Sequence, residues 1–315
     1  MAELDRLRPL WSDVFRRSPK TIFQSFEWNR LAAENFGDRL APLVCVAESD
    51  NGAAIIPAAA HIGGGRLELM GENLFDYRDL LHAGDERVLQ AAWQMIAEFD
   101  QPLLVSAVQP ENAALHWRQF EPVEFARAPW VDAATITAIQ FRSIHTRAAR
   151  QLRRLQRKGV TLQRYSGSES DQVRGIYQLK CEQFAADANN VFRDERRREF
   201  MVAAAALEAE TCQVFTLEDG DGCLVAGLVT FLDGEIRRFY TIYFDPAWAV
   251  YSPGVALLFE ATALSLQQGL SCDYMTGEYP YKLRFANASR MLYRVEASAA
   301  QLAAVAHQPA KRKIA

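Results

Sequence analysis

A ten-residue segment near the end of the chain concentrates side chains that can take part in proton transfer. Two acids, three tyrosines and one lysine occur in Asp273-Tyr-Met-Thr-Gly-Glu-Tyr-Pro-Tyr-Lys282. Glu278, with Asp273 second, could serve as a base. Tyr281 supplies a phenol and Lys282 an ammonium. Glu278 and Lys282 also stand four residues apart, so a local surface ion pair beside packed tyrosines explains the same pattern. The spacing leaves both interpretations open.

A helix start some twenty residues earlier could bind an anion. Ser252 is a suitable N-cap and Pro253 suits the first helical position. The N–H groups of the next residues, Gly254, Val255 and Ala256, would then face a phosphate together with the positive end of the helix. Many helices begin in this way without a ligand, so a purely structural role remains equally open.

The pattern around both segments predicts how they are positioned. Alternating or apolar runs predict strands over 212–218, 223–232 and 235–244, with Asp233-Gly234 as a two-residue hairpin turn. A helix over 255–268 follows, ending before Gly269, and then a short buried strand over 270–275. An antiparallel meander therefore ends in one parallel strand–helix–strand step. Ligands bind beyond the carboxyl ends of such parallel strands, which is where the segment after Asp273 begins.

The first half of the chain shows a weaker version of the same order. Strands are expected over 42–47, 53–62, 66–70 and 103–108, with a helix over 85–99 before the last of them. This repetition indicates a diverged internal duplication whose halves meet near 129–134. We therefore expect a mixed α/β fold with two domains, at 1–132 and 133–315, the second carrying the site.

A basic helix is expected between the two halves. Residues 144–158 have helical periodicity, and no acid occurs between Asp132 and Glu169. A solvated face explains this pattern, and so does a patch for phosphate groups of a coenzyme, a nucleotide-sugar or tRNA, with Arg147 and Arg150 as candidate ligands. One stripe collects the positive charges, whereas Ala148, Leu152 and Leu155 would face the core; the stripe comprises Arg147, Arg150, Arg154, Arg157 and Lys158.

The composition excludes several classes of protein. Half of the residues are hydrophobic and the formal net charge is −4, which disfavours nucleic-acid binding over the whole surface. Five scattered cysteines without paired spacing, and five isolated histidines, indicate reduced thiols and no metal site. The sequence contains no run of about 18 apolar residues, so we expect no membrane span. Its first residues do not resemble a secretion signal. We expect a cytoplasmic protein.

These residues together resemble the CelD/BcsL-type acetyltransferases of the GNAT superfamily. The likeness spans most of residues 20–290 and includes the early run Phe23-Gln-Ser-Phe-Glu-Trp28 and the basic stretch 147–159. Its most specific part is the later block Tyr243-Phe-Asp245-Pro246, Ser252-Pro253-Gly254 and Asp273-Tyr274-x-x-Gly277-Glu278-x-x-Tyr281-Lys282.

The resemblance implies two tandem GNAT-like domains, as in FemX-type peptidyltransferases, and an acyl-CoA donor. It also implies a role in exopolysaccharide or cellulose production. The GNAT pyrophosphate motif is Gln/Arg-x-x-Gly-x-Gly/Ala. Gly254 and Ala256 match this motif, whereas Tyr251 stands at its leading Gln/Arg position.

We expect the donor's pantetheine arm to pair like an added strand with the ends of strands 235–244 and 270–275, near Tyr240, Ile242 and Tyr243. Glu278 would activate an amine or hydroxyl of a small molecule or saccharide, and Tyr281 would protonate the leaving thiolate. Two alternatives remain: an aminoacyl-tRNA-dependent FemX-like transferase, and a non-catalytic binding module built on the same fold. Nucleic acid enters only under the first of these.

Overall fold

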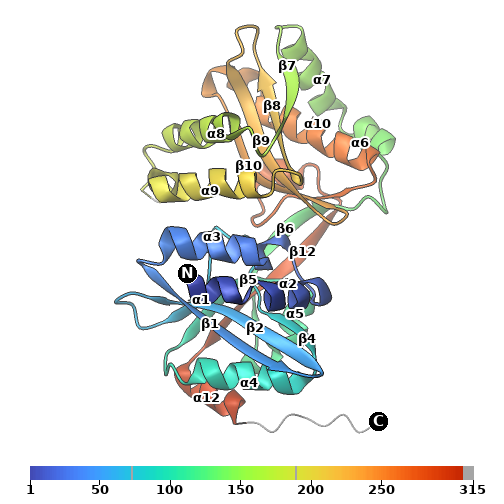
Figure 1. The fold of residues 1–315 in the computed structure, drawn as a ribbon. Helices are drawn as coiled ribbons and strands as arrows, with labels where there is room; N and C mark the ends of the chain where they lie inside the picture. Colours follow the sequence, from blue (N-terminus) through green and yellow to red (C-terminus); the bar gives the residue numbers. More distant parts are fainter. Residues whose placement is uncertain (72–73, 189, 308–315) are drawn as a thin grey trace. The chain divides into compact units, whose positions relative to one another are not determined.

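The computed structural model describes residues 1–71, 74–188 and 190–307 and divides the chain into two units (Figure 1). Unit 1 comprises Met1–Ala126 and the chain from Met291 onward, and unit 2 comprises Arg127–Arg290. The sequence suggested one division near 132, with everything after it in the second domain. The return to unit 1 has a clear cause, because Tyr293 to Ala297 pair with the strand Leu103–Val108.

Unit 2 is built on six strands in the spatial order β6-β11-β10-β9-β8-β7. Neighbouring strands are antiparallel, except for β10 and β11, which are parallel. The strands are β6 (Val123–Val131, which begins in unit 1), β7 (Thr161–Ser166), β8 (Cys212–Glu218), β9 (Leu224–Asp233), β10 (Ile236–Phe244) and β11 (Ser271–Asp273).

Helices cover both faces of this sheet, and Figure 1 shows α8 and α9 on one face and α6, α7 and α10 on the other. The main core of the unit lies beneath the second group, where Leu257 and Phe259 of α10 pack on Phe215 and Leu228. The helices are α6 (Ala138–Ile144), α7 (Thr146–Gln156), α8 (Ser170–Gln183), α9 (Glu195–Leu207), α10 (Pro253–Gln267) and α11 (Pro280–Leu283), with the short 3-10 segments η3 (Val191–Arg193) and η4 (Pro246–Tyr251).

The parallel pair β10 and β11 separates after three residues. Ile236 to Arg238 pair with Ser271 to Asp273, and β10 then continues alone on that side to Phe244. The chain leaves β11 through a turn in which Met275 has a positive φ of 62°. The parallel strands therefore open at their carboxyl ends, as expected for a ligand site in such a sheet.

Unit 1 repeats this order of elements. The hairpin of β1 and β2 continues antiparallel into β3, α4 follows, and β5 then pairs parallel to β3. β12 lies antiparallel to β5, and β4 pairs with β2. The strands are β1 (Leu40–Ser49), β2 (Gly52–His61), β3 (Leu67–Leu69), β4 (Leu81–Gly84), β5 (Leu103–Val108) and β12 (Ala288–Ala297, which begins in unit 2).

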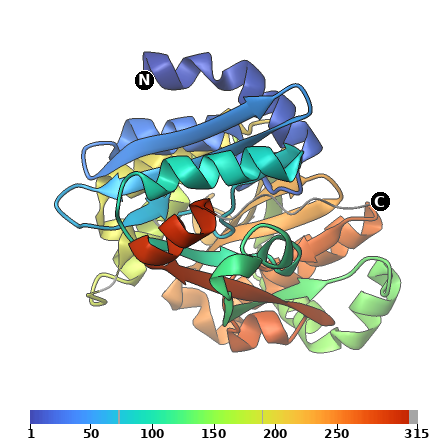
Figure 2. The same cartoon turned by 90° about the horizontal axis from the view of Figure 1, so that it is seen from below.

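The helices of unit 1 also form two layers. α2 and α3 cover one face, whereas α4 covers the other beside α12, as Figure 2 shows. Gln90 and Gln94 of α4 donate to carbonyl oxygens of α12, which ties this helix to unit 1. The helices are α1 (Ala2–Arg6), α2 (Arg8–Arg17), α3 (Phe26–Phe36), α4 (Glu86–Ala97), α5 (Pro110–Leu115) and α12 (Ala299–Ala306), with the 3-10 segments η1 (Ile22–Gln24) and η2 (Arg118–Phe120). The predicted fold class, a mixed α/β fold with a repeated strand order, is confirmed.

Candidate active site

The start of α10 differs from an ordinary capped helix. Ser252 has a left-handed backbone, with φ 52° and ψ 55°, and its side chain makes no capping hydrogen bond. Ser252 therefore occupies the N-cap position, as predicted, but its side chain does not cap the helix. η4 ends at this residue, where the Ser252 N–H bonds to the Ala249 carbonyl, and proline at the next position disfavours the right-handed conformation. The Ser252 hydroxyl is consequently not used by the helix.

Two backbone N–H groups are available at this helix start. The Ala256 N–H donates to the Ser252 carbonyl at 3.1 Å, which is the first helical bond, so this predicted phosphate ligand is already satisfied. Pro253 has no N–H. Among the described residues, no acceptor is found for the N–H groups of Gly254 and Val255. An anion would therefore meet these two donors at the positive end of a fifteen-residue helix.

A cavity of about 240 Å³ adjoins these two donors. Five of the predicted site residues line it, although they come from three separate segments. The floor is apolar, which suits the alkyl chain of a cofactor arm better than a charged group. The lining residues are Ile242, Phe244, Ala249, Ser252, Gly254, Val255 and Tyr281.

Gly254 lets the cavity approach the helix backbone closely. A Cβ atom at this position would lie 3.3 Å from Phe244 Cδ1, which is tighter than ordinary contact. Glycine is therefore the residue that leaves the two N–H groups accessible without displacing Phe244.

A β-bulge distorts β10 beside the point where it leaves β11. Phe239 pairs with Thr230 and Thr241 with Val229, so Tyr240 is the extra residue. Bulges of this kind often redirect backbone groups next to active sites. Tyr243 is buried and lies outside the cavity lining; burial raises the pKa of its phenol, with smaller contributions from Asp245 and Glu182.

Asp273 is held in a buried ion pair. One of its carboxylate oxygens accepts from Arg238 at 2.6 Å and the other accepts from the Met275 N–H at 2.8 Å. Only 1% of Asp273 is exposed. These contacts fix the turn after β11 and leave the carboxylate away from solvent, which is the geometry of a structural anchor.

Two other predicted residues of this segment, Lys282 and Glu278, lie in different surroundings. The Lys282 ammonium is buried and donates to the carbonyl of Thr276 at 2.8 Å and, more weakly, to that of Met275 at 3.4 Å, so it closes the same turn. Glu278 is exposed, and within the described chain its carboxylate has neither a hydrogen bond nor an ion pair. It does not line the cavity.

Tyr281 is the residue of this segment that faces the cavity. Burial, with a smaller contribution from Tyr279, raises the pKa of its phenol to about 12. The group is therefore neutral at any physiological pH and can donate a hydrogen bond into the cavity.

The basic stripe of α7 lies next to the start of α10. The Arg154 guanidinium sits 5.2 Å from the centre of the Tyr251 ring, which precedes the cavity residue Ser252. Arg147 and Arg150 are exposed on the same helix, and Ala148, Leu152 and Leu155 are buried as predicted. A cation thus stands beside Tyr251, the position where the GNAT motif has Gln or Arg. The sequence placed Arg154 in the stripe but did not single it out.

Lys180 of α8 contacts the backbone of a cavity residue, and the sequence gave no reason to select it. Its ammonium donates to the Ile242 carbonyl at 2.7 Å, from the face of the sheet opposite α10. Burial, and then the charge of Lys282, lowers its pKa to about 8. Its position depends on how α8 packs on β10, which no local pattern reveals.

The corresponding positions of unit 1 do not suit an anionic ligand. α4, the counterpart of α10, begins with Asp85, whose carboxylate caps the helix, followed by Glu86. Two acids at the helix start would repel a phosphate.

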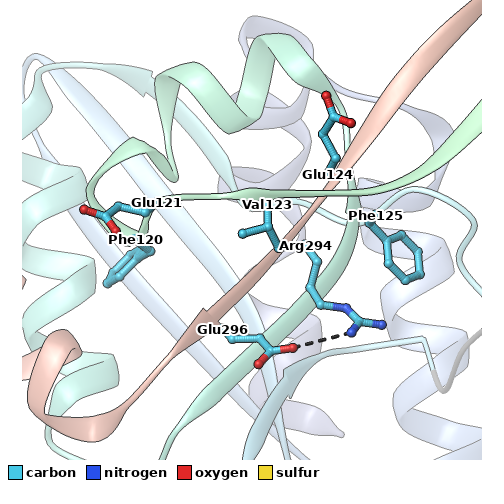
Figure 3. A pocket seen from close by; sticks show the side chains of 7 residues that line it. All are labelled: Phe120, Glu121, Val123, Glu124, Phe125, Arg294 and Glu296. Carbon is cyan, nitrogen blue, oxygen red and sulfur yellow. Dashed lines mark hydrogen bonds and ion pairs between the residues drawn. The ribbon is translucent and has the colours of Figure 1, made fainter.

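A second cavity, in unit 1, is also unfavourable for phosphate groups (Figure 3). Its volume is about 480 Å³, and three carboxylates and one guanidinium border it. Arg294 lies 4.6 Å from the centre of the Phe125 ring and 3.5 Å from the Glu296 carboxylate. The lining residues are Phe120, Glu121, Val123, Glu124, Phe125, Arg294 and Glu296.

Two further searches bear on cofactors and membranes. In residues 1–71, 74–188 and 190–307, no three His, Cys, Asp or Glu side chains are grouped as a metal site requires. In the same part of the chain, no helix combines the length and apolarity needed to cross a bilayer.

Residues 141–283 match the family model described as an acetyltransferase (GNAT) domain. The site of unit 2 lies within the matched residues. The match contains the basic helix, the bulged strand, the start of α10 and the turn that carries Tyr281. None of the curated proteins compared with the chain matches it significantly.

Solved structures similar to this chain cover nearly all of it. FemX is 8% identical, with a TM-score of 0.64, and covers 92% of this chain and 95% of its own. The C-terminal domain (DUF2156) of a putative lysylphosphatidylglycerol synthetase from Agrobacterium fabrum is 13% identical, with a TM-score of 0.61 and coverages of 96% and 95%. A conserved protein of unknown function from Bacteroides thetaiotaomicron is 11% identical, with a TM-score of 0.63 and coverages of 91% and 96%. At these identities the likeness concerns the fold alone.

Proposed function

We propose that the protein is an acyltransferase that moves an acyl group from acyl-CoA to an amine or hydroxyl acceptor. The observation that carries this proposal is the cavity at the start of α10, where the free N–H groups of Gly254 and Val255 adjoin an apolar floor. An acyl-CoA has the matching chemistry, because a pyrophosphate is followed by a long, largely apolar arm.

The donor is proposed to bind with its pyrophosphate on Gly254 and Val255. Arg154 supplies a cation beside this position, which takes over the task of the Gln or Arg that Tyr251 replaces in the motif. The pantetheine arm runs over Ile242 and Phe244 and pairs with the part of β10 that β11 leaves unpaired. Arg147 and Arg150 lie further along the same helix and are proposed to attract the donor's phosphates.

The transfer itself uses groups at the bulge of β10 and at Tyr281. Backbone N–H groups between Tyr240 and Tyr243 are proposed to stabilise the oxyanion that forms on the thioester carbonyl. Tyr281 is proposed to donate a hydrogen bond to the leaving sulfur. Its pKa of about 12 lies well above the value of about 8.5 for an ordinary thiol, so the proton stays mainly on the phenol.

The CelD/BcsL-type resemblance leads us to propose a saccharide or polysaccharide precursor as the acceptor and the cytoplasm as the compartment. Of the residues predicted for catalysis, Glu278 is proposed to border the acceptor side of the site, and Asp273 and Lys282 are proposed to hold the turn that positions Tyr281.

A thermal-shift screen tests donor binding directly. Acetyl-CoA, longer acyl-CoAs and free CoA at about 100 times their Kd should stabilise the native state by about 2.7 kcal/mol, whereas adenosine or pantetheine alone should act less. If none of the CoA compounds raises the melting temperature, even at millimolar concentration, the acyl-CoA assignment is wrong.

Six exposed cations lie on α7 and directly after it, and their positive charge favours an aminoacyl-tRNA donor as the second candidate. They are Arg147, Arg150, Arg153, Arg154, Arg157 and Lys158. Such a donor would bind with a steep dependence on salt, since each neutralised phosphate releases a counterion. Filter binding of bulk tRNA between 50 and 200 mM salt separates the two donors: about a thousandfold loss of affinity favours tRNA, and undetectable binding favours acyl-CoA.

A non-catalytic module would bind CoA but release no thiol from acetyl-CoA with any acceptor.

A further inference from the structure

We propose that Lys180, in its neutral form, is the general base that accepts the proton of the acceptor amine as that amine attacks the acyl carbon. This inference rests on the proposed acyl-CoA function, and it replaces the role that the sequence suggested for Glu278. It also narrows the acceptor to an amine.

The position of Lys180 supports this role. Its ammonium is 2.7 Å from the carbonyl of Ile242, a residue that lines the donor cavity, on the part of β10 that β11 no longer pairs. Lys180 reaches this strand from α8, whereas the donor cavity lies on the side of α10. A thioester placed where β10 and β11 separate would therefore have the donor's arm on the α10 face of the sheet and Lys180 on the α8 face. The donor occupies the α10 face, so the acceptor is proposed to approach the thioester from the α8 face.

The surroundings of Lys180 favour its neutral form. The rings of Phe192 and Phe184 lie 5.3 and 5.7 Å from its nitrogen and favour the ammonium, whereas within the described chain no carboxylate pairs with it. Burial and then the like charge of Lys282 lower its pKa to about 8.

Other ionisable groups lie on the elements around α8. Arg198 of α9 contacts Cys181, and Glu182, which is exposed, bonds to Gln178. On β10, Tyr243 follows Ile242, and burial raises the pKa of its phenol. None of these supplies a carboxylate to the Lys180 ammonium, so its neutral form is accessible near neutral pH, where a general base works best.

The carboxylates of the site are poor candidates for the same task. Asp273 is occupied by Arg238 and by the Met275 N–H, and only 1% of it is exposed. Glu278 is exposed and lies outside the cavity lining. Lys180 is thus the group with both the position and the proton affinity that the step requires.

The step balances without any further reactant. The amine nitrogen forms a bond to the acyl carbon, the carbonyl electron pair moves to oxygen, and the nitrogen loses a proton to Lys180. The intermediate then reforms the carbonyl and breaks the carbon–sulfur bond. The CoA thiolate receives the proton from the Lys180 ammonium through solvent. A thiolate whose conjugate thiol has a pKa of about 8.5 binds a proton slightly more tightly than Lys180, whose pKa is about 8. The products are an amide and CoA, and Lys180 is neutral again.

The first test measures the proton affinity of Lys180 directly. The chain has only six lysines, so the protein can be methylated with ¹³C-formaldehyde and titrated by NMR with CoA bound, the signal of Lys180 being the one that disappears in Lys180→Arg. A midpoint within one unit of 8 supports the proposal; a midpoint near the ordinary value of about 10.4 overturns it. This readout does not depend on knowing the acceptor.

The second test separates a base from a structural contact. Arginine can keep the hydrogen bond to the Ile242 carbonyl but stays protonated at every working pH. With acetyl-CoA and glucosamine as the probe acceptor, Lys180→Arg should lose about 100-fold or more in kcat/KM and its rise through pH 8, while CoA still raises its melting temperature. The surface control Lys20→Arg should keep the wild-type rate and profile, and Glu278→Gln should keep the rise through pH 8 whatever its rate.

The outcomes distinguish this inference from the proposed function. If CoA fails to stabilise the wild type, the proposed function is wrong. If CoA binds and thiol is released, but Lys180→Arg keeps its rate within threefold and the same pH profile, Lys180 only supports β10. Loss of the rise through pH 8 in Glu278→Gln instead would return the base role to Glu278.

Discussion

Replacing Arg154 by glutamine tests how the protein holds an anionic donor without the Gln or Arg of the GNAT motif. The substitution keeps the length and polarity of the side chain but removes the charge beside Tyr251. Arg153→Gln is a matched control, because Arg153 is equally exposed on the same helix but points about 100° away around its axis.

The expected magnitude follows from the exposure of Arg154. A hydrogen bond to a charged group contributes about 1.5–3 kcal/mol, and solvent screening at an exposed side chain reduces this to about 1–2 kcal/mol. The Kd for CoA should therefore rise by about 5- to 30-fold in Arg154→Gln and by less than about twofold in Arg153→Gln. The difference should shrink at high salt, because the Debye length falls to about 3 Å at 1 M.

Isothermal titration calorimetry with CoA and with dephospho-CoA, at two salt concentrations, measures these values. If Arg154 contacts the pyrophosphate, both ligands should lose affinity by the same factor. Arg154 does not hold the pyrophosphate if Arg154→Gln binds CoA as tightly as the wild type does, or if Arg153→Gln loses as much affinity for CoA as Arg154→Gln.

Three further substitutions test other parts of the site. Gly254→Val should abolish CoA stabilisation in thermal-shift assays while the circular dichroism spectrum stays native, since even a Cβ would lie 3.3 Å from Phe244; retained CoA binding would contradict this. Asp273→Ala should lower the free energy of unfolding by about 1.5–3 kcal/mol in urea titrations, because it removes one of the two carboxylates that pair with the buried Arg238, and a change below about 1 kcal/mol would contradict the anchor role. Tyr281→Phe should lower kcat by about tenfold with little change in the Kd for CoA. Because the pKa of the Tyr281 phenol is about 12, its ionisation should cause no loss of wild-type activity below about pH 11. An unchanged kcat in Tyr281→Phe would contradict the proposed hydrogen bond to sulfur.

Much of unit 2 could be predicted because its signals are local. The strand Cys212–Glu218 occurs at the residues predicted, and Gly234 has the positive φ that its hairpin turn requires. Proline at the first position of α10 and the buried stripe of α7 also depend only on nearby residues. These local signals were sufficient to place the site at the start of α10.

The chemistry within the site could not be predicted in the same way, because it depends on contacts between distant segments. Asp273 was a candidate base until its partner Arg238, 35 residues earlier, was known. Lys180 approaches Ile242 across 62 residues, from a helix that no motif marked. Which charged groups pair, and which stay unpaired, follows from packing and not from periodicity.

The most direct measurement of the central claim is the crystal structure of the protein with CoA bound. The pyrophosphate is expected to accept hydrogen bonds from the N–H groups of Gly254 and Val255, at about 2.7–3.2 Å, with Arg154 nearby and the pantetheine arm over Ile242. Density for CoA at any other place in the molecule, with the cavity at the start of α10 left empty, would contradict it.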